Sequence, residues 1–185
     1  MEKPTSYCDA VMMMEAENVH RHYHDKQYGF PINDDNELFG RLILEINQAG
    51  LSWTTILNKA ENFRKAYSEF KISAVAKYGE KDITRLLNNP GIIRNRLKIN
   101  AAVYNAQKII ELQSNFGSFQ NWLDYHHPLT KAEWVKLFKK TFRFTGGEIT
   151  NEFLMSTGYL EGAHVADCPI YEEILRAEPK WKLTS

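Results

Sequence analysis

The chain has 185 residues and a formal net charge of zero, with 43% hydrophobic and 25% charged residues. These values are ordinary for a soluble globular protein, and the length suits one domain of residues 1–185, or two small lobes that share a core. Because the overall charge is zero, any binding of nucleic acid must come from a local basic patch.

The sequence also argues against a membrane or secreted location. No apolar run approaches the length of a membrane span, and the first residues, MEKPTSYC, lack the apolar core of a signal peptide. Two cysteines do not make a disulfide framework in a chain of this size. We therefore expect a cytoplasmic protein without membrane association, and we expect it to be a monomer.

The first motif along the chain is a group of alternating histidines, His20, His22 and His24, followed directly by Asp25. These four residues could ligate a catalytic metal, as in a phosphohydrolase. Their spacing argues against this, because on a helix His20 and His24 share a face and His22 does not.

Residues 34–53 form the most informative stretch. Asp34 or Asp35 can cap the start of a helix, and Gly50 suits the left-handed position just past its end. Leucines and isoleucines at helical spacing form an apolar stripe, and Glu45 lies within that stripe. A buried carboxylate is costly unless it has a partner, so Glu45 either pairs inside the protein or faces a ligand.

The residues after this helix favour the ligand. Ser52 can cap a second helix that begins with Trp53. A buried carboxylate beside a large aromatic ring can hold a flat ring with polar edges, such as a nucleobase.

A basic stretch follows. Residues 83–110 contain five basic residues and no acidic ones, and they surround a Pro90-Gly91 turn between two helices. The turn can present backbone N–H groups to a phosphate, which predicts a helix-hairpin-helix that grips DNA. The alternative is an ordinary helical turn with a solvated basic face.

The remaining segments also predict helices. They are 53–70, 73–77, 82–87, Asn95 to Phe116, 130–138 with a Thr130/Glu133 capping box, 148–157, and 169–175. The best strand candidate, residues 141–145, is short and stops at two glycines. The sequence therefore predicts an all-α globule.

Four residues near the two chain ends could bind a metal. His164 and Cys168 are spaced so that a helical turn would point both side chains the same way. With Cys8 and His24 they could form a closed Cys2His2 zinc site that joins the two ends. The alternative is two free buried cysteines and ordinary histidines.

Together these pieces resemble the 3-methyladenine DNA glycosylase I family, within the helix-hairpin-helix superfamily. The matching segments are Tyr23-His24-Asp25, Leu38-Phe39, Glu45, the run QAGLSW ending at Trp53, Gly91-Ile92-Ile93-Arg94 with Arg96 and Lys98, Phe142-Arg143-Phe144, and His164 with Cys168. The resemblance implies an all-α glycosylase that flips 3-methyladenine out of alkylated double-stranded DNA and hydrolyses its N-glycosidic bond.

The resemblance also implies roles for single residues. Glu45 matches the pocket carboxylate that binds the flipped base, Tyr23 matches a tyrosine on the base edge, and Trp53 matches the stacking tryptophan. The residues implied to bind DNA are Gly91, Arg94, Arg96 and Lys98. The residues implied to bind structural Zn²⁺ are Cys8, His24, His164 and Cys168. No lysine lies in the pocket segments, so a Schiff-base lyase step is not expected.

Two departures from the family pattern keep a second hypothesis open. His20 stands where the family commonly has another pocket tyrosine, and Gly147-Glu148 replaces two threonines at a position that a DNA strand could pass. A non-catalytic DNA-binding module with the same fold is therefore the alternative.

Overall fold

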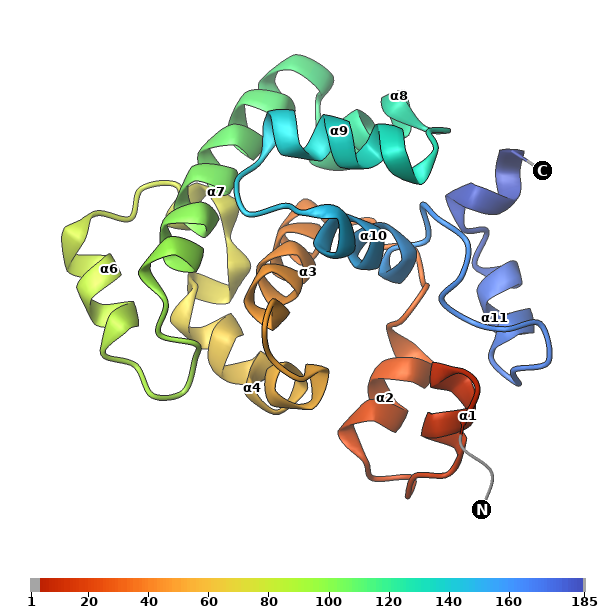
Figure 1. Ribbon diagram of the computed structural model, residues 1–185. Helices are drawn as coiled ribbons and strands as arrows, with labels where there is room; N and C mark the ends of the chain where they lie inside the picture. Colours follow the sequence, from red (N-terminus) through yellow and green to blue (C-terminus); the bar gives the residue numbers. More distant parts are fainter. Residues whose placement is uncertain (1–3, 185) are drawn as a thin grey trace. The chain divides into compact units, whose positions relative to one another are not determined.

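The computed structural model describes residues 4–184, and every regular element in that range is helical (Figure 1). The segment 141–145, the best strand candidate, forms no strand. Helix α9 runs to Thr141, and Phe144 takes a positive φ of 61°, which no regular strand accommodates. None of the described helices is long and apolar enough to cross a membrane.

The chain divides into two compact units. The first contains the residues up to Ile32 and those from Leu154 onward, and the second contains Asn33–Phe153. The first holds α1 (Tyr7–Met12), α2 (Val19–Lys26), α11 (Tyr171–Arg176) and the 3₁₀ segment η2 (Lys180–Thr184). The second holds α3 (Asp35–Gln48), α4 (Trp53–Ala66), η1 (Ser68–Phe70), α5 (Ile72–Val75), α6 (Glu80–Leu87), α7 (Arg96–Phe116), α8 (Phe119–His126), α9 (Lys131–Thr141) and most of α10 (Gly147–Ser156).

Helix α3 is the central element of the second unit, where it contacts α4, α5, α7 and α8 (Figure 1). Its buried face carries Leu38, Phe39, Leu42, Ile43 and Ile46. Gly40 lets η1 approach closely, because a Cβ atom there would lie 2.4 Å from the ring of Phe70. The apolar stripe read from the sequence is therefore the core-facing side of this helix.

The predicted helix caps are confirmed. Asp34 accepts the backbone N–H of Glu37 at the start of α3, and Gly50 follows the end of this helix with a φ of 80°. Ser52 accepts the N–H of Thr55 and starts α4. The capping box of Thr130 and Glu133 starts α9.

Asp35 has a different role from the predicted cap. Its carboxylate accepts the backbone N–H groups of Phe119 (2.8 Å) and Gln120 (3.0 Å), so it caps the distant helix α8. Helix α8 then supplies Phe119 and Trp122 to an aromatic core, which Phe138, Phe142 and Phe153 complete.

The first unit brings the two ends of the described chain together. Cys8, Cys168, Ile170 and Ile174 form one buried cluster, and Phe30, Tyr171 and Trp181 pack against it. The backbone N–H of Gly29 donates to the carbonyl of Ser156, which joins the segment after α2 to the end of α10. This unit is small, and its core contains both cysteines.

Candidate functional site

Glu45 lies on the third turn of α3 and is 4% exposed. Arg41, one turn earlier on the same helix, is also buried, and its positive charge favours the ionised form of Glu45. Glu152 contributes an opposing negative charge. The carboxyl group of Glu45 is therefore buried inside the second unit, as its place in the apolar stripe predicts.

Burial dominates the proton affinity of this carboxylate. Desolvation raises the pKa of Glu45 from 4.5 to about 8, although Arg41 lowers it and Glu152 raises it further. In the free protein at neutral pH, Glu45 is therefore mostly protonated. A cation bound beside it would favour the carboxylate form, because an opposite charge lowers the pKa of an acid.

A short turn connects Glu45 to Trp53. The turn contains Gly50 and the cap Ser52, and Trp53 is the first residue of α4 and is half-buried. The backbone N–H of Leu51 donates to the carbonyl of Gln48, which fixes the reversal. The chain thus keeps the carboxylate and the indole a few residues apart, at the junction of two capped helices.

Tyr23, the third residue assigned to base binding, belongs to the other unit. It is buried on α2, and its ring lies 5.5 Å from the ring of Tyr28. His20, on the same helix, shares a 2.9 Å hydrogen bond with the hydroxyl of Tyr7. Burial lowers the pKa of His20, which favours the neutral imidazole.

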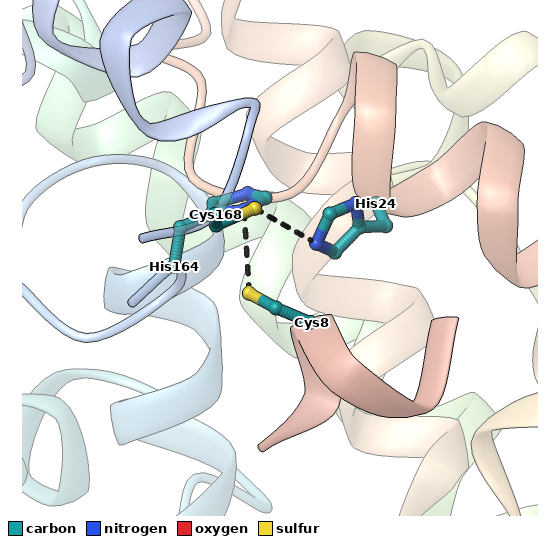
Figure 2. Close-up of side chains that lie close together, drawn as sticks. All are labelled: Cys8, His24, His164 and Cys168. Atoms are coloured by element: carbon teal, nitrogen blue, oxygen red, sulfur yellow. Dashed lines mark hydrogen bonds between the residues drawn. The ribbon is translucent and has the colours of Figure 1, made fainter. Parts of the chain in front are cut away.

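The first unit contains a buried cluster of four side chains that could hold a metal ion, Cys8, His24, His164 and Cys168 (Figure 2). One ligand atom from each residue lies within 4.8 Å of the other three. The Nδ1 atom of His164 is 3.7 Å from the Sγ of Cys8 and 3.4 Å from that of Cys168. The Nε2 atom of His24 is 3.6 Å from the Sγ of Cys168.

The sulfur–nitrogen distances are compatible with tetrahedral coordination of a metal ion such as zinc. Zn–S bonds of about 2.3 Å and Zn–N bonds of about 2.0 Å place neighbouring ligands roughly 3.3–3.8 Å apart. The segment with His164 and Cys168 forms turns, not the helical turn that would align them, yet their ligand atoms still converge. Burial, the largest cause, raises the pKa of the Cys8 thiol to about 11, and the neighbouring Cys168 adds to this.

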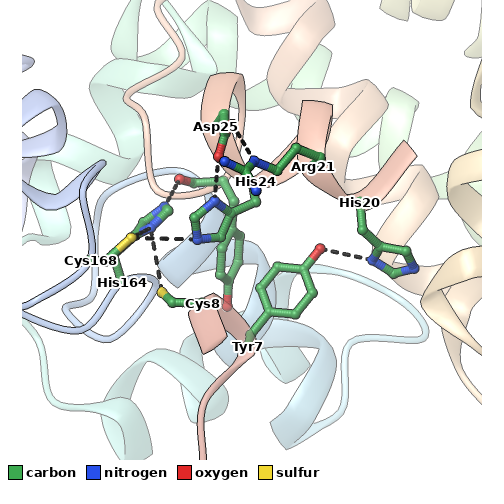
Figure 3. A network of polar contacts seen from close by, with 9 residues as sticks. Tyr7, Cys8, His20, Arg21, His24, Asp25, His164 and Cys168 are labelled. Carbon is green, nitrogen blue, oxygen red and sulfur yellow. Dashed lines mark hydrogen bonds and ion pairs between the residues drawn. The ribbon is translucent and has the colours of Figure 1, made fainter. Parts of the chain in front are cut away.

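A second layer of hydrogen bonds orients both histidines (Figure 3). The Nδ1 atom of His24 lies 2.7 Å from a carboxylate oxygen of Asp25, and Arg21 donates to the other oxygen of this carboxylate at 3.0 Å. The Nε2 atom of His164 lies 2.8 Å from the carbonyl of Tyr28. Each histidine therefore has one nitrogen fixed by an acceptor and the other directed into the cluster, as in many metal sites.

This arrangement does not resemble the four-residue phosphohydrolase site. His24 belongs to the Cys2His2 cluster, His20 pairs with Tyr7, and His22 is exposed. Asp25 supports His24 from outside the cluster. The alternating histidines therefore point to different places.

The predicted hairpin lies between α6 and α7 in the second unit (Figure 1). Arg94 and Arg96 are exposed, and Arg96 makes only a 3.4 Å surface ion pair with Glu80. The backbone N–H of Gly91 donates to the side-chain oxygen of Asn89 at 2.8 Å. The two arginines are accessible to a phosphate, whereas the Gly91 N–H has an internal acceptor in the free protein.

Lys98 does not lie where the sequence analysis placed it. Its side chain is 5% exposed, and its ammonium group donates to the backbone carbonyls of Asn47 (2.9 Å) and Ala49 (2.7 Å). A buried ammonium that is held by two carbonyls cannot also bind a phosphate on the surface. We therefore remove Lys98 from the predicted DNA-binding set.

Some functional neighbours were not found from the sequence. Arg41 is one helical turn from Glu45, so the spacing of four residues was a usable signal. The carbonyl of Tyr28 and the side chain of Asn89 gave no signal, because their roles depend on how distant segments fold together.

Comparisons with known proteins identify the family of this chain. The sequence profile described as methyladenine glycosylase matches residues 13–134. The DNA-3-methyladenine glycosylase of Haemophilus influenzae is 34% identical over 172 residues, which cover 83% of this chain and 92% of that protein. The DNA-3-methyladenine glycosylase 1 of Escherichia coli is 34% identical over 168 residues, covering 80% and 89%.

Solved structures that resemble this chain belong to the same family. A tyrosine-to-phenylalanine variant of 3-methyladenine DNA glycosylase I, in complex with 3-methyladenine, superimposes with a TM-score of 0.77 at 32% identity and covers 84% of this chain and 94% of that one. The enzyme from Staphylococcus aureus gives a TM-score of 0.76 at 32% identity, covering 84% and 93%. The chain therefore belongs to the methyladenine glycosylase family. The all-helical fold predicted from the sequence is confirmed by this match.

Proposed function

We propose that this chain is a monofunctional DNA base-excision glycosylase that releases 3-methyladenine from alkylated double-stranded DNA. The observation that carries the proposal is the buried carboxylate of Glu45, one short turn before the indole of Trp53. Membership of the family supports it, since relatives that cover most of this chain are named DNA-3-methyladenine glycosylases.

The reaction breaks the bond between the base and C1′ of deoxyribose. Methylation at N3 places a positive charge on adenine, so the base can leave with the bonding electron pair as a neutral molecule. A water oxygen forms the new bond to C1′ and loses its proton to solvent. The leaving base is already activated, so the enzyme must mainly extract it from the duplex and recognise it.

Glu45 and Trp53 supply this recognition. The carboxylate accepts hydrogen bonds from the exocyclic amine side of the purine and complements its positive charge. The indole stacks on the cationic ring, with a cation–π attraction of about 0.5–2 kcal/mol. Tyr23 offers a hydroxyl to the base edge. Normal purines are neutral and gain neither charge interaction.

The raised pKa of Glu45 makes recognition depend on protonation. The cationic base favours the carboxylate, so its entry expels the proton that Glu45 carries at neutral pH. The proton release links binding to the charge of the base. A neutral adenine gives no such driving force.

The hairpin grips the DNA backbone near the lesion. Arg94 and Arg96 are exposed beside the turn and bind phosphates without reading the sequence. Gly91 has no side chain, so the backbone can approach a phosphate closely at this position. Its N–H must then release the side-chain oxygen of Asn89 and donate to the phosphate instead.

We further propose that Cys8, His24, His164 and Cys168 hold one structural Zn²⁺. The four ligand atoms fit tetrahedral coordination, and the carbonyl and carboxylate partners of the histidines fit its outer layer. When bound, the metal supplies a cross-link and no chemistry, because four protein ligands leave no open position. Two free buried cysteines suit the reducing cytoplasm, where we place the enzyme as a monomer.

The formation of abasic sites in methylated duplex DNA tests the function. The wild-type protein should create abasic sites, and Glu45→Gln should reduce the rate at least about tenfold, because the amide cannot complement the cationic base. Glu61→Gln is a matched control, since Glu61 is an exposed carboxylate on α4 that pairs with Lys65. No abasic sites with wild-type protein that binds DNA would favour the non-catalytic module. An unaffected Glu45→Gln would remove the proposed role of this residue.

A further inference from the structure

Lys98 is the third residue of α7, directly after the DNA-binding hairpin. Its backbone N–H donates to the cap residue Asn95 at 3.1 Å, and its side chain runs inward to the end of α3. There the ammonium group donates to the carbonyls of Asn47 and Ala49 at 2.9 and 2.7 Å. One side chain therefore joins the hairpin to the end of the helix that carries Glu45.

The carbonyls at the end of α3 lack partners within the helix, as at every helix C-terminus. The carbonyl of Gln48 accepts the N–H of Leu51, and the side-chain amide of Gln48 donates to the carbonyl of Leu51. Asn47 and Ala49 depend on Lys98 instead. The path of the turn that leads to Trp53 is thus set partly by a cation from another helix.

Charge favours this contact as well. The C-terminus of a helix carries partial negative charge, which a cation complements. The ring of Phe144 lies 5.8 Å from the ammonium group, and Asn105 fixes the loop of Phe144 to α7 through two hydrogen bonds with the backbone of Arg143. Among the described residues no carboxylate forms an ion pair with Lys98.

Burying a cation without a carboxylate costs desolvation, which an apolar side chain of similar length would avoid, but the apolar side chain would remove the donor from the carbonyls of Asn47 and Ala49. The arrangement therefore needs a reason other than packing. Lys98 is not among the charged groups that shift the pKa of Glu45. Any effect of Lys98 on Glu45 must therefore pass through the backbone of α3 and its turn.

We propose that Lys98 is a positioning residue, which keeps the hairpin that grips DNA in register with Glu45 and Trp53. The inference rests on the glycosylase function proposed above. The phosphates bound by Arg94 and Arg96 then set the position of the flipped base. Lys98 sets the position of the Glu45 and Trp53 side chains that bind this base.

The test compares Lys98→Met, which keeps the length and removes the donors, with Lys98→Arg, which keeps them. Gln107→Leu is the matched control, since Gln107 on the same helix donates to the carbonyl of Ala76 at 3.0 Å, at the end of α5. The measurements are the single-turnover rate of excision at saturating enzyme, and the salt dependence of affinity for methylated duplex DNA.

We expect Lys98→Met to lower the saturating rate roughly 10- to 100-fold, because a small misplacement of a binding group costs about that much. DNA affinity and its salt slope should stay unchanged, Lys98→Arg should restore most of the rate, and Gln107→Leu should behave like wild type. A salt slope shallower by about one, with a normal saturating rate, would show instead that Lys98 binds a phosphate and would overturn the proposal.

Hydrogen exchange provides a test that needs no activity. In Lys98→Met the backbone amides of residues 49–53 should exchange faster than in wild type, whereas in Gln107→Leu they should not. If the wild-type protein released no base, the proposed function would fail, and this exchange result would still decide the positioning contact. If Lys98→Met did not fold, the same comparison would use Lys98→Gln, and unchanged exchange in that variant would contradict the proposal.

Discussion

At the scale of single residues, Glu45 binds a proton more tightly in the folded chain than in the unfolded chain. Burial raises its pKa from 4.5 to about 8, with Arg41 opposing and Glu152 adding to the shift. Below about pH 4.5 both states hold the proton. As the pH rises towards 8, the unfolded chain loses this proton first, so the carboxyl group destabilises the folded state increasingly.

This linkage predicts how Glu45→Gln changes stability. Between pH 5 and 8, the free energy of unfolding of wild type should fall relative to that of the variant by about 1.4 kcal/mol per pH unit. Urea unfolding of both proteins at pH 5, 6.5 and 8 measures the difference. The two proteins should converge towards pH 5, and the variant should be the more stable at pH 8. Curves that stay parallel would mean that Glu45 is ionised in the free protein.

At the scale of helices, local sequence was sufficient for four helices that a residue just before them caps, but not for α1 and α2, whose caps Ser6 and Asn18 are also local. Asp34, Ser52, Asn95 and Thr130 each accept an N–H three residues later, and the helices they start were all predicted. Helix α8 was missed, although Ser118 provides the same signal. Its second cap, Asp35, lies 84 residues away and could not be inferred.

The residues of the candidate site also differ in whether the sequence could predict their surroundings. The burial of Glu45 follows from its place in an apolar stripe, so the sequence could predict it. The contact of Lys98 could not be predicted, because a sequence shows a positive charge but not its direction. Lys98 was assigned to DNA with its neighbours, and only the fold shows that it points to the end of α3.

The hairpin predicts a specific salt dependence. Replacing both Arg94 and Arg96 by glutamine should reduce the slope of log affinity against log salt by about 2, because each phosphate contact contributes about 0.9 to the slope. Fluorescence titration of duplex DNA at several salt concentrations measures this. The double variant Arg176→Gln/Lys182→Gln, which removes two exposed cations of the other compact unit, should keep the wild-type slope. Equal slopes for all three proteins would exclude the hairpin arginines as phosphate ligands.

At the scale of the whole molecule, the Cys2His2 cluster joins residues from the two ends of the described chain. Cys8 and His164 are 156 positions apart, so a metal bond between them would greatly restrict the unfolded chain. Only the interval between His164 and Cys168 is ligand-like in the sequence, and the fold brings Cys8 and His24 to this pair.

Metal removal tests this cross-link. Purified protein should contain one zinc per chain, and a chelator should lower Tm by at least about 10 °C, since several kcal/mol of lost stability shift Tm by about 2–4 °C each in a chain of this size. Cys168→Ser should lose the metal, whereas His22→Ala should keep it because His22 is exposed outside the cluster. Folded protein without zinc, with a Tm that is insensitive to chelator, would contradict the proposal.

The proposed activity depends on a buried acid and an indole that accept a cationic purine from duplex DNA. Chromatography with mass detection of the bases released from methylated DNA tests this most directly. We predict release of 3-methyladenine by wild-type protein, with no release of unmodified adenine or guanine and strongly reduced release by Glu45→Gln. Undiminished release by Glu45→Gln, or no methylated purine from active, folded wild-type protein, would contradict the account.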